Sequence, residues 1–261
     1  GDKKLAHTFA EDVTLLQKLS IKPVVVHGGG PQIGSMLDKL KIESSFIDGL
    51  RITNEETVEI VEMVLSGSIN KDIVNKIHAA GGLAIGLSGK DAKLILANKL
   101  TDKFKDPNSN IEKFLDIGFV GKPIKINPSI INIISDNLMI PIIAPVGFGA
   151  NNETYNINAD TAAGAIASSL KAERILLLTD VKGVLDSNKK LISNISVTKA
   201  ESMISDKIIT GGMIPKIKTC LETVGSGVKA AVIIDGRSPH AILREIFTTG
   251  GSGTMIDNNF E

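Results

Sequence analysis

The sequence predicts an α/β fold, namely a doubly wound, mostly parallel sheet with helices on both faces. Short aliphatic runs at residues 24–26, 140–146 and 175–178 have the composition of strands buried in a parallel sheet. Segments with apolar residues at three- and four-residue intervals lie between these runs, as amphipathic helices require. No internal repeat or low-complexity linker interrupts the order of strands and helices.

The first expected element is a helix, because residues 2–19 place apolar side chains at helical spacing. A parallel sheet normally begins with a strand, so we expect a further strand upstream of Gly1. A strand at residues 24–26, a run of glycines and a helix from 31 or 32 to 40 come next. The TNEE motif at residues 53–56 predicts a capping box that opens a helix with Val58, Val61 and Leu65 on its apolar face.

The remaining elements follow from periodicity and from glycine and proline punctuation. We expect helices at residues 71–79, 128–137, 160–170, 199–205, 213–224 and 240–247, strands at 83–87, 140–146, 175–178 and 230–234, and inserted hairpins between 94 and 126. The alanine-rich composition of residues 160–170 is typical of a helix packed closely on a sheet. The part of the chain before Ala150 contains the glycine run and Arg51, and the part after it contains the apolar strand that ends at Asp180. We therefore expect two lobes, 1–150 and 151–261, on one continuous sheet.

Composition excludes several classes of function. The 29 basic and 29 acidic residues give a net charge of +0, so no basic surface for nucleic acid or membranes is indicated. Cys220 is the only cysteine, which excludes an intrachain disulfide or a cysteine metal cluster and fits a reducing compartment. No apolar run is long enough to span a bilayer, and the first residues are polar rather than signal-like.

The HGGGP motif at residues 27–31 is the first candidate site. Three glycines after a buried strand leave backbone amides uncovered, and a helix that starts behind them directs its N-terminus the same way. Such a junction suits a phosphate, although a plain turn is an equally good interpretation of this motif alone. The spacing matches neither a dinucleotide loop nor a Walker loop.

Other polar residues are expected at strand ends or helix starts, where open α/β sheets bind ligands. Arg51 suits a carboxylate or phosphate, although a surface salt bridge is the alternative. Asn156 and Asp160 belong to a polar NINAD segment at residues 156–160, where an aspartate can equally be a helix cap. Lys216 follows glycines that open a helix, and a solvated lysine is as good an interpretation. The TDVKGV segment at residues 179–184 is either a nucleotide cradle or a loop.

Together these groups predict phosphoryl transfer as the reaction class. Glycine amides and a lysine stabilise charge on a transferring phosphoryl group, while an arginine and an asparagine hold an acidic acceptor. The chain offers no nucleophile and no visible His, Cys or Glu metal cage. Magnesium would therefore arrive with the phosphates of the nucleotide.

Five ordered motifs resemble the acetylglutamate kinases of the amino-acid kinase family. They are HGGGP at 27–31, GLRIT at 49–53, NINAD at 156–160, TDVKGVL at 179–185 and GMIPK at 212–216. The resemblance covers essentially the whole chain. It implies a three-layer αβα sandwich in which the N-terminal lobe binds N-acetyl-L-glutamate and dimerises, and the C-terminal lobe binds ATP. The reaction it implies phosphorylates the substrate's side-chain carboxylate in arginine biosynthesis.

The resemblance also assigns roles to residues. Gly29 and Gly30 would bind the γ-phosphoryl group and the reacting carboxylate, Arg51 and Asn156 would hold the substrate, and Asp160 would organise the catalytic lysines. Lys216 would stabilise the transferring phosphoryl group. The nucleotide contacts it implies are Thr179, Asp180, Val181, Lys182, Gly183, Val184, Leu185, Ile208, Ile209, Thr210 and Lys216.

The end of the chain, residues 240–254, is similar to that of the arginine-inhibited, hexameric members. This implies L-arginine as feedback inhibitor, a homodimer or hexamer, and regulatory roles for His240, Glu245 and Gly253, although a plain terminal helix and edge strand is the alternative. The sequence resembles the cyanobacterial and plastid members of the family. That similarity implies the nitrogen-signalling protein P-II as a partner and a cytoplasmic or plastid location.

One departure from the family is the missing Lys-x-Gly-Gly motif, which members carry on the strand before the opening helix. We expect that strand to precede Gly1, and the 261-residue chain as written to have little kinase activity without it. The alternatives are aspartate, carbamate, uridylate and glutamate 5-kinases of the same family, and a regulatory module that binds ligands without turnover. A dinucleotide oxidoreductase fits least, because the glycine spacing is wrong.

Overall fold

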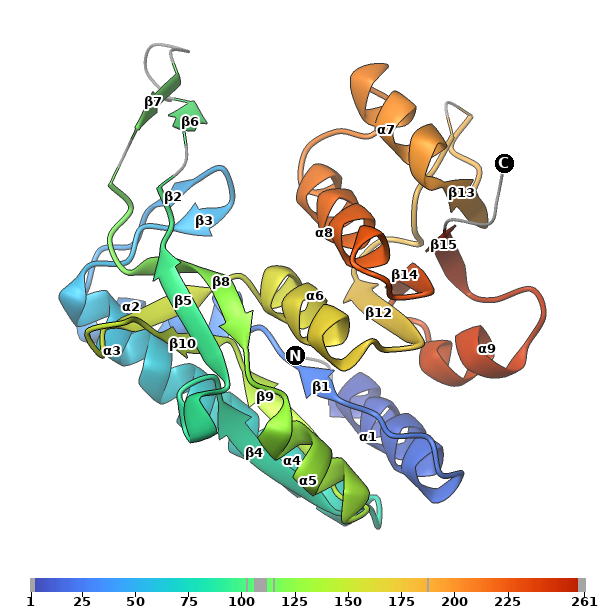
Figure 1. Cartoon of the computed structure of the whole chain (residues 1–261), viewed down its shortest axis with the longest axis horizontal. Coiled ribbons are helices and arrows are strands. Elements are labelled where there is room, and N and C mark those ends of the chain that lie inside the picture. The colour runs from blue at the N-terminus through green and yellow to red at the C-terminus, as the bar shows by residue number, and fades with distance from the viewer. Residues whose placement is uncertain (1–2, 102, 106–111, 115, 187, 258–261) are drawn as a thin grey trace. The chain divides into compact units, whose positions relative to one another are not determined.

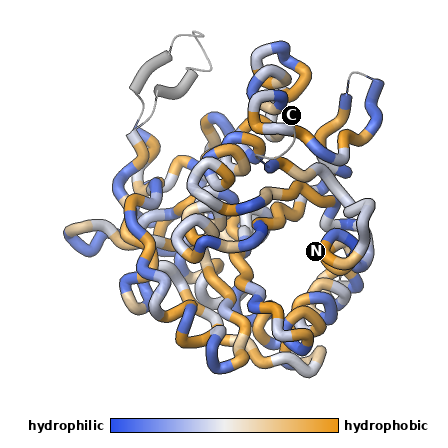
Figure 2. Tube along the Cα trace, turned by 45° about the vertical axis from the view of Figure 1, so that its right-hand side comes forward, coloured by the Kyte–Doolittle hydropathy of each residue, from blue (hydrophilic) through white to orange (hydrophobic). Residues whose placement is uncertain are grey.

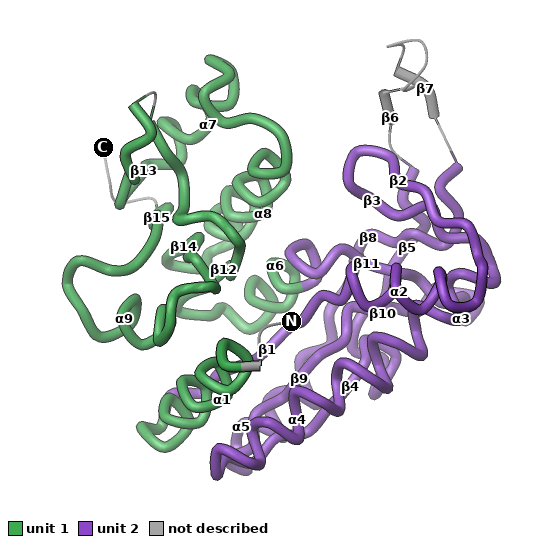
Figure 3. Tube along the Cα trace, turned by 180° about the vertical axis from the view of Figure 1, so that it is seen from behind, with its two compact units in different colours: residues 1–20, 163–261 green, residues 21–162 purple. Residues whose placement is uncertain are grey.

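The computed structural model describes residues 3–101, 103–105, 112–114, 116–186 and 188–257. The chain divides into two compact units, coloured separately in Figure 3. Unit 1 comprises Gly1–Ser20 and Ala163–Glu261, and unit 2 comprises Ile21–Ala162. The division into lobes 1–150 and 151–261 on one continuous sheet stays a prediction.

Unit 2 contains most of the expected strands and helices, drawn in Figure 1. Its strands are β1 (Val25–Val26), β2 (Phe46–Ile47), β3 (Leu50–Arg51), β4 (Ala84–Ser88), β5 (Ile95–Lys99), β6 (Lys103–Lys105), β7 (Glu112–Phe114), β8 (Val120–Ile126), β9 (Ile140–Ala144), β10 (Val146–Phe148) and β11 (Thr154–Ile157). Its helices are α2 (Gly30–Leu40), α3 (Glu55–Glu62), the π-helix η1 (Met63–Ile69), α4 (Asn70–Ala79), the 3₁₀ turn η2 (Asp91–Lys93) and α5 (Ser129–Asp136). The start of α6 (Ala159–Leu170) also belongs to it.

A parallel three-stranded sheet, in the order β1-β9-β4, forms the centre of unit 2. Every residue of β9 is buried, as expected of the middle strand of a parallel sheet. The hairpins predicted between residues 94 and 126 are confirmed, since β5 pairs with β8 and β6 pairs with β7, both antiparallel. β5 and β8 also close a small barrel with β10 and β11. The loop between β6 and β7 lies outside the described residues.

The helical region after β3 differs from the expectation in two ways. Asn54, not Thr53, caps α3, because its side chain accepts a hydrogen bond from Thr57 N at 2.8 Å. The Thr53 hydroxyl instead donates to Arg51 O, and Thr53 is fully buried. The two expected helices are also continuous, because the π-helix η1 joins α3 to α4. Asn70 N–H reaches Leu65 O across one i→i+5 turn.

Unit 1 is built on a four-stranded sheet, in the order β12-β14-β15-β13. Its strands are β12 (Arg174–Thr179), β13 (Asn194–Ser196), β14 (Ala230–Asp235) and β15 (Gly253–Asp257), and its helices are α1 (Lys3–Lys18), α7 (Val197–Ser205), α8 (Met213–Gly225) and α9 (Ala241–Phe247), with most of α6. β12 and β14 run parallel over six residue pairs, whereas β15 is antiparallel to β14. The mixture of parallel sheets and helices confirms the predicted α/β class.

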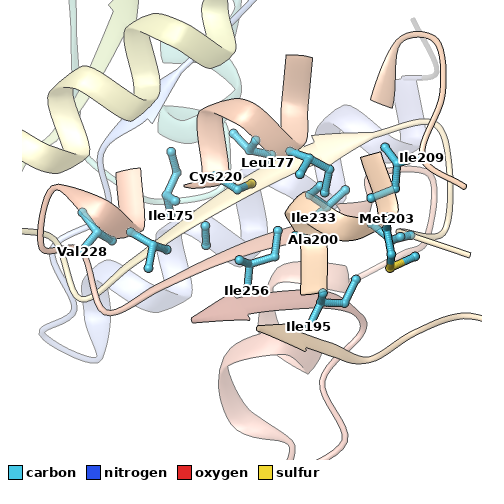
Figure 4. Packing of buried hydrophobic residues seen from close by; sticks show 14 of the residues in the cluster. Ile175, Leu177, Ile195, Ala200, Met203, Ile209, Cys220, Val228, Ile233 and Ile256 are labelled. Atoms are coloured by element: carbon cyan, nitrogen blue, oxygen red, sulfur yellow. The ribbon is translucent and has the colours of Figure 1, made fainter. Parts of the chain in front are cut away.

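The core of unit 1, drawn in Figure 4, joins side chains of the sheet to side chains of α7 and α8. Ile233 and Ile256 from the sheet and Cys220 from α8 are fully buried in it. Cys220 is therefore a small apolar core residue. Hydrophobic and hydrophilic residues alternate along the helices in Figure 2, the pattern that buries one helix face.

The alanine-rich helix α6 packs closely on helix α8 of unit 1, and its Ala163 and Ala167 belong to the same hydrophobic core as residues of the sheet. A Cβ atom at Gly164 would lie 2.7 Å from Thr223 Oγ1 of α8, so only glycine allows this approach. Within the described part of the chain, every helix is too short or too polar to cross a membrane.

Candidate functional site

The glycine loop of unit 2, residues 28–30, leads from β1 into α2 with Pro31 in the first turn. A Cβ atom at Gly29 would lie 2.3 Å from Ile69 Cδ1 and 2.7 Å from Leu65 Cδ2, so η1 packs directly against this residue. A Cβ atom at Gly30 would meet no atom within 4 Å. Packing against η1 therefore explains why residue 29 is a glycine, whereas the space in front of Gly30 is open.

Backbone N–H groups of this loop are available to a ligand. Among the residues that the structure describes, the amides of Gly29 and Gly30 donate to no protein acceptor. They stand at the N-terminus of the 11-residue helix α2, where the helix dipole favours negative charge. This geometry agrees with the predicted phosphate or carboxylate site.

Arg51 lies beside the glycine loop, on β3. Its Nη2 donates to Gly30 O at 3.0 Å, its Nη1 donates to Ser44 Oγ, and its guanidinium lies 4.5 Å from the centre of the Phe46 ring. Arg51 is buried, and within the described ranges it forms no ion pair with a carboxylate. Burial lowers the pKa of Arg51, and the charge of Asp38 acts in the opposite direction but is the smaller effect. Among the described residues, the alternative of a surface salt bridge is therefore wrong, and the side chain suits an anionic ligand.

Asn156 lies on β11 and joins the same part of unit 2. Its Nδ2 lies 3.3 Å from Thr53 Oγ1, and that hydroxyl donates to Arg51 O at 2.8 Å. Asn158, rather than Asp160, caps α6, because its Oδ1 accepts from Thr161 N at 3.1 Å. The alternative of Asp160 as the helix cap is therefore wrong. Asp160 occupies the first turn of α6.

Sequence reasoning missed a buried network behind the glycine loop. His27 Nδ1 lies 3.0 Å from Gly28 O, and its Nε2 lies 3.2 Å from Nδ2 of Asn70. Asn70 Oδ1 accepts from Lys71 Nζ at 3.1 Å, and the same lysine donates to Gly86 O at 3.0 Å. Burial lowers the pKa of His27. One sequence signal could have revealed this network. Asn70 is a polar residue seven positions before the core residue Ile77, so both lie on the same face of the helix.

In unit 1, the predicted nucleotide segment begins at the carboxyl end of β12. A Cβ atom at Gly183, whose φ is +137°, would lie 2.7 Å from Thr254 Oγ1. The fully buried Thr254 hydroxyl accepts from Val184 N at 2.8 Å and donates to Ile192 O at 2.7 Å. Thr254 therefore joins both ends of the loop 184–192, a contact that the sequence did not indicate.

Exposed apolar side chains lie in both predicted nucleotide segments. Val181 and Leu185 in the segment, and Ile208 in the second predicted nucleotide segment, are 37–41% exposed, whereas Ile209 is buried. Apolar side chains left in contact with water suit a nucleotide base.

The N-terminus of α8 carries the GMIPK motif. Cβ atoms at Gly211 and Gly212 would meet nothing within 4 Å, so the space before this 13-residue helix is open. Lys216 is half-buried in the first turns of α8. A helix start of this kind, with a lysine close behind it, suits a phosphate.

A second group missed from the sequence lies at the end of β14, next to the end of β12. Asp235 pairs with Thr179 across the parallel ladder, and Arg237 donates to Asp235 through Nε and Nη2, both at 2.9 Å. These bonds lower the pKa of Asp235 and raise that of Arg237. Lys182 and Asp180 act electrostatically on the same pair. Charged groups therefore gather where both strands end.

The three predicted regulatory residues also have structural partners in unit 1. His240 Nδ1 lies 2.6 Å from Asp12 Oδ1 of α1, and Glu245 is buried, with Oε1 3.4 Å from Nη1 of Arg174. A Cβ atom at Gly253 would lie 2.0 Å from Ile233 O, so pairing of β15 with β14 requires this glycine. The regulatory roles stay predictions.

Comparison with known sequences places this chain in a family. The sequence model described as the amino acid kinase family matches residues 1–235. The chain belongs to the amino acid kinase family. The acetylglutamate kinase of Rhodospirillum centenum is 60% identical over 256 residues, which cover 98% of this chain and 84% of that protein. The resemblance found in the five motifs is confirmed.

Solved structures agree with this membership. The protein smu.665 of Streptococcus mutans has a TM-score of 0.78 at 28% identity and covers 96% of this chain and 91% of its own. N-acetylglutamate synthase from Neisseria gonorrhoeae, complexed with coenzyme A and N-acetyl-glutamate, has a TM-score of 0.85 at 20% identity. It covers 100% of this chain and 57% of its own, and it supports the amino-acid kinase fold alone.

Proposed function

We propose that this member of the amino acid kinase family is an acetylglutamate kinase. It would transfer the γ-phosphoryl group of ATP to the side-chain carboxylate of N-acetyl-L-glutamate, in arginine biosynthesis. The observation that carries the acceptor is Arg51, a buried guanidinium without a carboxylate partner among the described residues, hydrogen-bonded to the glycine loop. An acidic substrate supplies the missing charge.

The acceptor needs no catalytic base. A glutamate side chain has a pKa of about 4.3, so at neutral pH it is already a carboxylate. One of its oxygens would attack the γ-phosphorus, the bond from that phosphorus to the β–γ bridging oxygen would break, and ADP would leave with the electron pair. The protein then contributes position and charge stabilisation, the main demands of phosphoryl transfer.

Unit 2 would bind the acceptor. Amides of Gly29 and Gly30 at the start of α2 would contact the phosphoryl group and the reacting carboxylate, since they have no protein acceptor in the described ranges. Arg51 and Asn156 would hold the rest of the substrate. Asp160 would organise the catalytic lysines.

Unit 1 would bind ATP. The open helix start before α8 fits phosphates, and the exposed apolar side chains of Val181, Leu185 and Ile208 fit a base. Lys216 would stabilise the transferring phosphoryl group. Mg²⁺ would be bound through the nucleotide phosphates.

Further expectations rest on the resemblance. Inhibition by L-arginine, a homodimer or hexamer, binding of P-II, and a cytoplasmic or plastid location stay predictions, as do the roles of His240, Glu245 and Gly253.

A direct assay separates this function from its alternatives. The full-length protein would be incubated with Mg²⁺-ATP and each of N-acetyl-L-glutamate, aspartate, glutamate, carbamate and uridylate, with ADP release measured. Hydroxylamine would trap an acyl phosphate as its hydroxamate. We expect turnover and hydroxamate with N-acetyl-L-glutamate. Faster turnover of another acceptor would assign another kinase of the family, and ligand binding without ADP release would indicate a regulatory module.

A further inference from the structure

The network behind the glycine loop has a direction fixed by its chemistry. Asn70 is fully buried, and its Nδ2 faces two carbonyl oxygens, Leu87 O at 3.2 Å and Ile142 O at 3.0 Å. On the other side of the amide, Asn70 Oδ1 faces Lys71 Nζ, a group that can only donate. A flipped amide would oppose acceptor to acceptor and donor to donor. The position of the amide nitrogen is therefore determined.

This amide fixes the tautomer of His27. Nδ2 of Asn70 has two protons and no acceptor, and it shares these protons among Leu87 O, Ile142 O and Nε2 of the imidazole, 3.2 Å away. A proton on Nε2 would face this donor, so Nε2 is the unprotonated nitrogen. The ring proton then lies on Nδ1, which donates to Gly28 O at 3.0 Å. Burial of His27 lowers its pKa and favours this neutral ring.

The hydrogen bond from His27 to Gly28 O in turn sets the direction of the Gly29 N–H, which belongs to the candidate site. In a trans peptide, C=O and the following N–H point in opposite directions, and the described chain contains no cis peptide. Holding Gly28 O toward His27 therefore turns Gly29 N–H away from it. Leu65 and Ile69 of η1 pack against the same glycine and restrict its movement.

We propose that His27 and Asn70 are positioning residues that aim the Gly29 N–H at the transferring phosphoryl group. This role rests on the proposed function of the glycine loop. Both side chains would act through the backbone of the glycine loop, to which His27 is hydrogen-bonded. A lone buried histidine satisfied by its neighbours is the purely structural alternative, and it predicts no selective effect on the chemical step.

Two substitutions of His27 separate these interpretations. In asparagine, Nδ2 is attached to Cγ as Nδ1 is in histidine, so His27→Asn retains a donor for Gly28 O. His27→Gln moves the amide nitrogen one bond further and leaves that carbonyl without its donor. We expect kcat of the full-length protein to fall about 10- to 100-fold in His27→Gln, less than the roughly 100- to 1000-fold loss for a deleted oxyanion donor because the Gly29 N–H is misdirected and not removed, with the KM for ATP unchanged. His27→Asn should recover most of that loss.

A control lies on α4, where Nε2 of the exposed His78 is 3.2 Å from both N and O of Ala84. His78→Gln removes a hydrogen-bonded histidine outside the loop, and kcat should remain unchanged. Equal losses of kcat in His27→Gln and His27→Asn, or a loss in His78→Gln as large as in His27→Gln, would overturn the proposal while leaving the kinase assignment intact.

A measurement without turnover keeps the test independent of the proposed function. The ¹H–¹⁵N resonance of Gly29 would be recorded in the ligand-free protein and in both His27 variants. We expect a large shift or broadening in His27→Gln and a much smaller change in His27→Asn. An unaltered Gly29 resonance in His27→Gln would overturn the positioning role, even if the protein phosphorylates no acceptor.

Discussion

The glycine loop of unit 2 and the segment 179–185 of unit 1 both follow a parallel strand, but buried groups hold them differently. Buried groups hold the glycine loop: His27 is hydrogen-bonded to the loop and to Asn70, and the side chains of η1 pack against Gly29. In segment 179–185, Asp180, Val181 and Lys182 are exposed, and the far end is held by the buried hydroxyl of Thr254 and by the backbone bond from Ile192 N to Val184 O. A loop fixed before the ligand arrives suits charge stabilisation, whereas an exposed segment suits ligand binding.

The comparison predicts that changes in the glycine loop affect kcat most. Gly29→Ala should lower kcat about 100-fold, because its methyl group must displace Ile69 and Leu65 or move the loop by about 1 Å. Gly30→Ala meets no protein atom and should leave the free energy of unfolding unchanged or raise it by up to about 1 kcal/mol. It should nevertheless impair turnover, because the methyl group enters the open space. Steady-state kinetics and thermal unfolding of both variants test this, and full activity in Gly30→Ala would show that no ligand uses that space.

Arg51 tests whether unit 2 recognises the acceptor. Arg51→Lys keeps the charge but loses the planar fork, and hydrogen bonds to charged groups contribute about 1.5–3 kcal/mol, so KM for N-acetyl-L-glutamate should rise about 10- to 100-fold. KM for ATP should change little. Lys22→Gln is the control, since Lys22 forms only an exposed pair with Asp136. If KM for ATP rose and KM for the acceptor did not, the assignment of ligands to units would be reversed.

Thr254 tests the segment in unit 1. Thr254→Val removes one acceptor and one donor at nearly constant volume, so the loop 184–192 loses both bonds to the Thr254 hydroxyl and keeps the backbone bond from Ile192 N to Val184 O. With about 0.5–1.5 kcal/mol per hydrogen bond, we expect KM for ATP to rise about 3- to 10-fold, with kcat little changed. Thr254→Ser retains the hydroxyl and should behave like the wild type in ATP binding measured by calorimetry. Weakened binding in the serine variant equal to that in the valine variant would argue against the hydroxyl.

The smallest expected effect concerns pH. Burial lowers the pKa of His27 below its ordinary value of 6.5, so the unfolded chain binds a proton more readily than the folded one. As pH falls below about 6.5, the free energy of unfolding should decrease, by at most about 1.4 kcal/mol per pH unit from this residue. His27→Asn should remove this part of the slope. Urea unfolding between pH 7.5 and about 5 measures it, and identical slopes in both proteins would exclude His27 as the source.

Much of the fold could be predicted from local patterns. The spacing of apolar residues located α1, α2, α5 and α8 to within about two residues, as helical periodicity allows. The capping of α3 was wrong, because both Thr53 and Asn54 can cap a helix and the bridge between Thr53 and Gly118 decided between them. The π-helix η1 was missed, because its residues also fit an ordinary α-helix.

The candidate site was predicted in part. Glycine runs and a basic residue near a helix start can be recognised in sequence, because each acts through its own backbone or charge. His27 and Asn70 could not be linked in this way, since they lie 43 residues apart, and Thr254 is 70 residues from Val184.

The sequence by itself determined the α/β class, the family and the identity of the groups that can meet a phosphoryl group. These properties depend on short-range spacing and on residue type. The tertiary structure alone decided that Arg51 is buried without a carboxylate partner among the described residues, that Gly30 faces open space while Gly29 does not, and that His27 holds Gly28 O. Burial and hydrogen-bond partners depend on what folding brings together, so no local pattern specifies them.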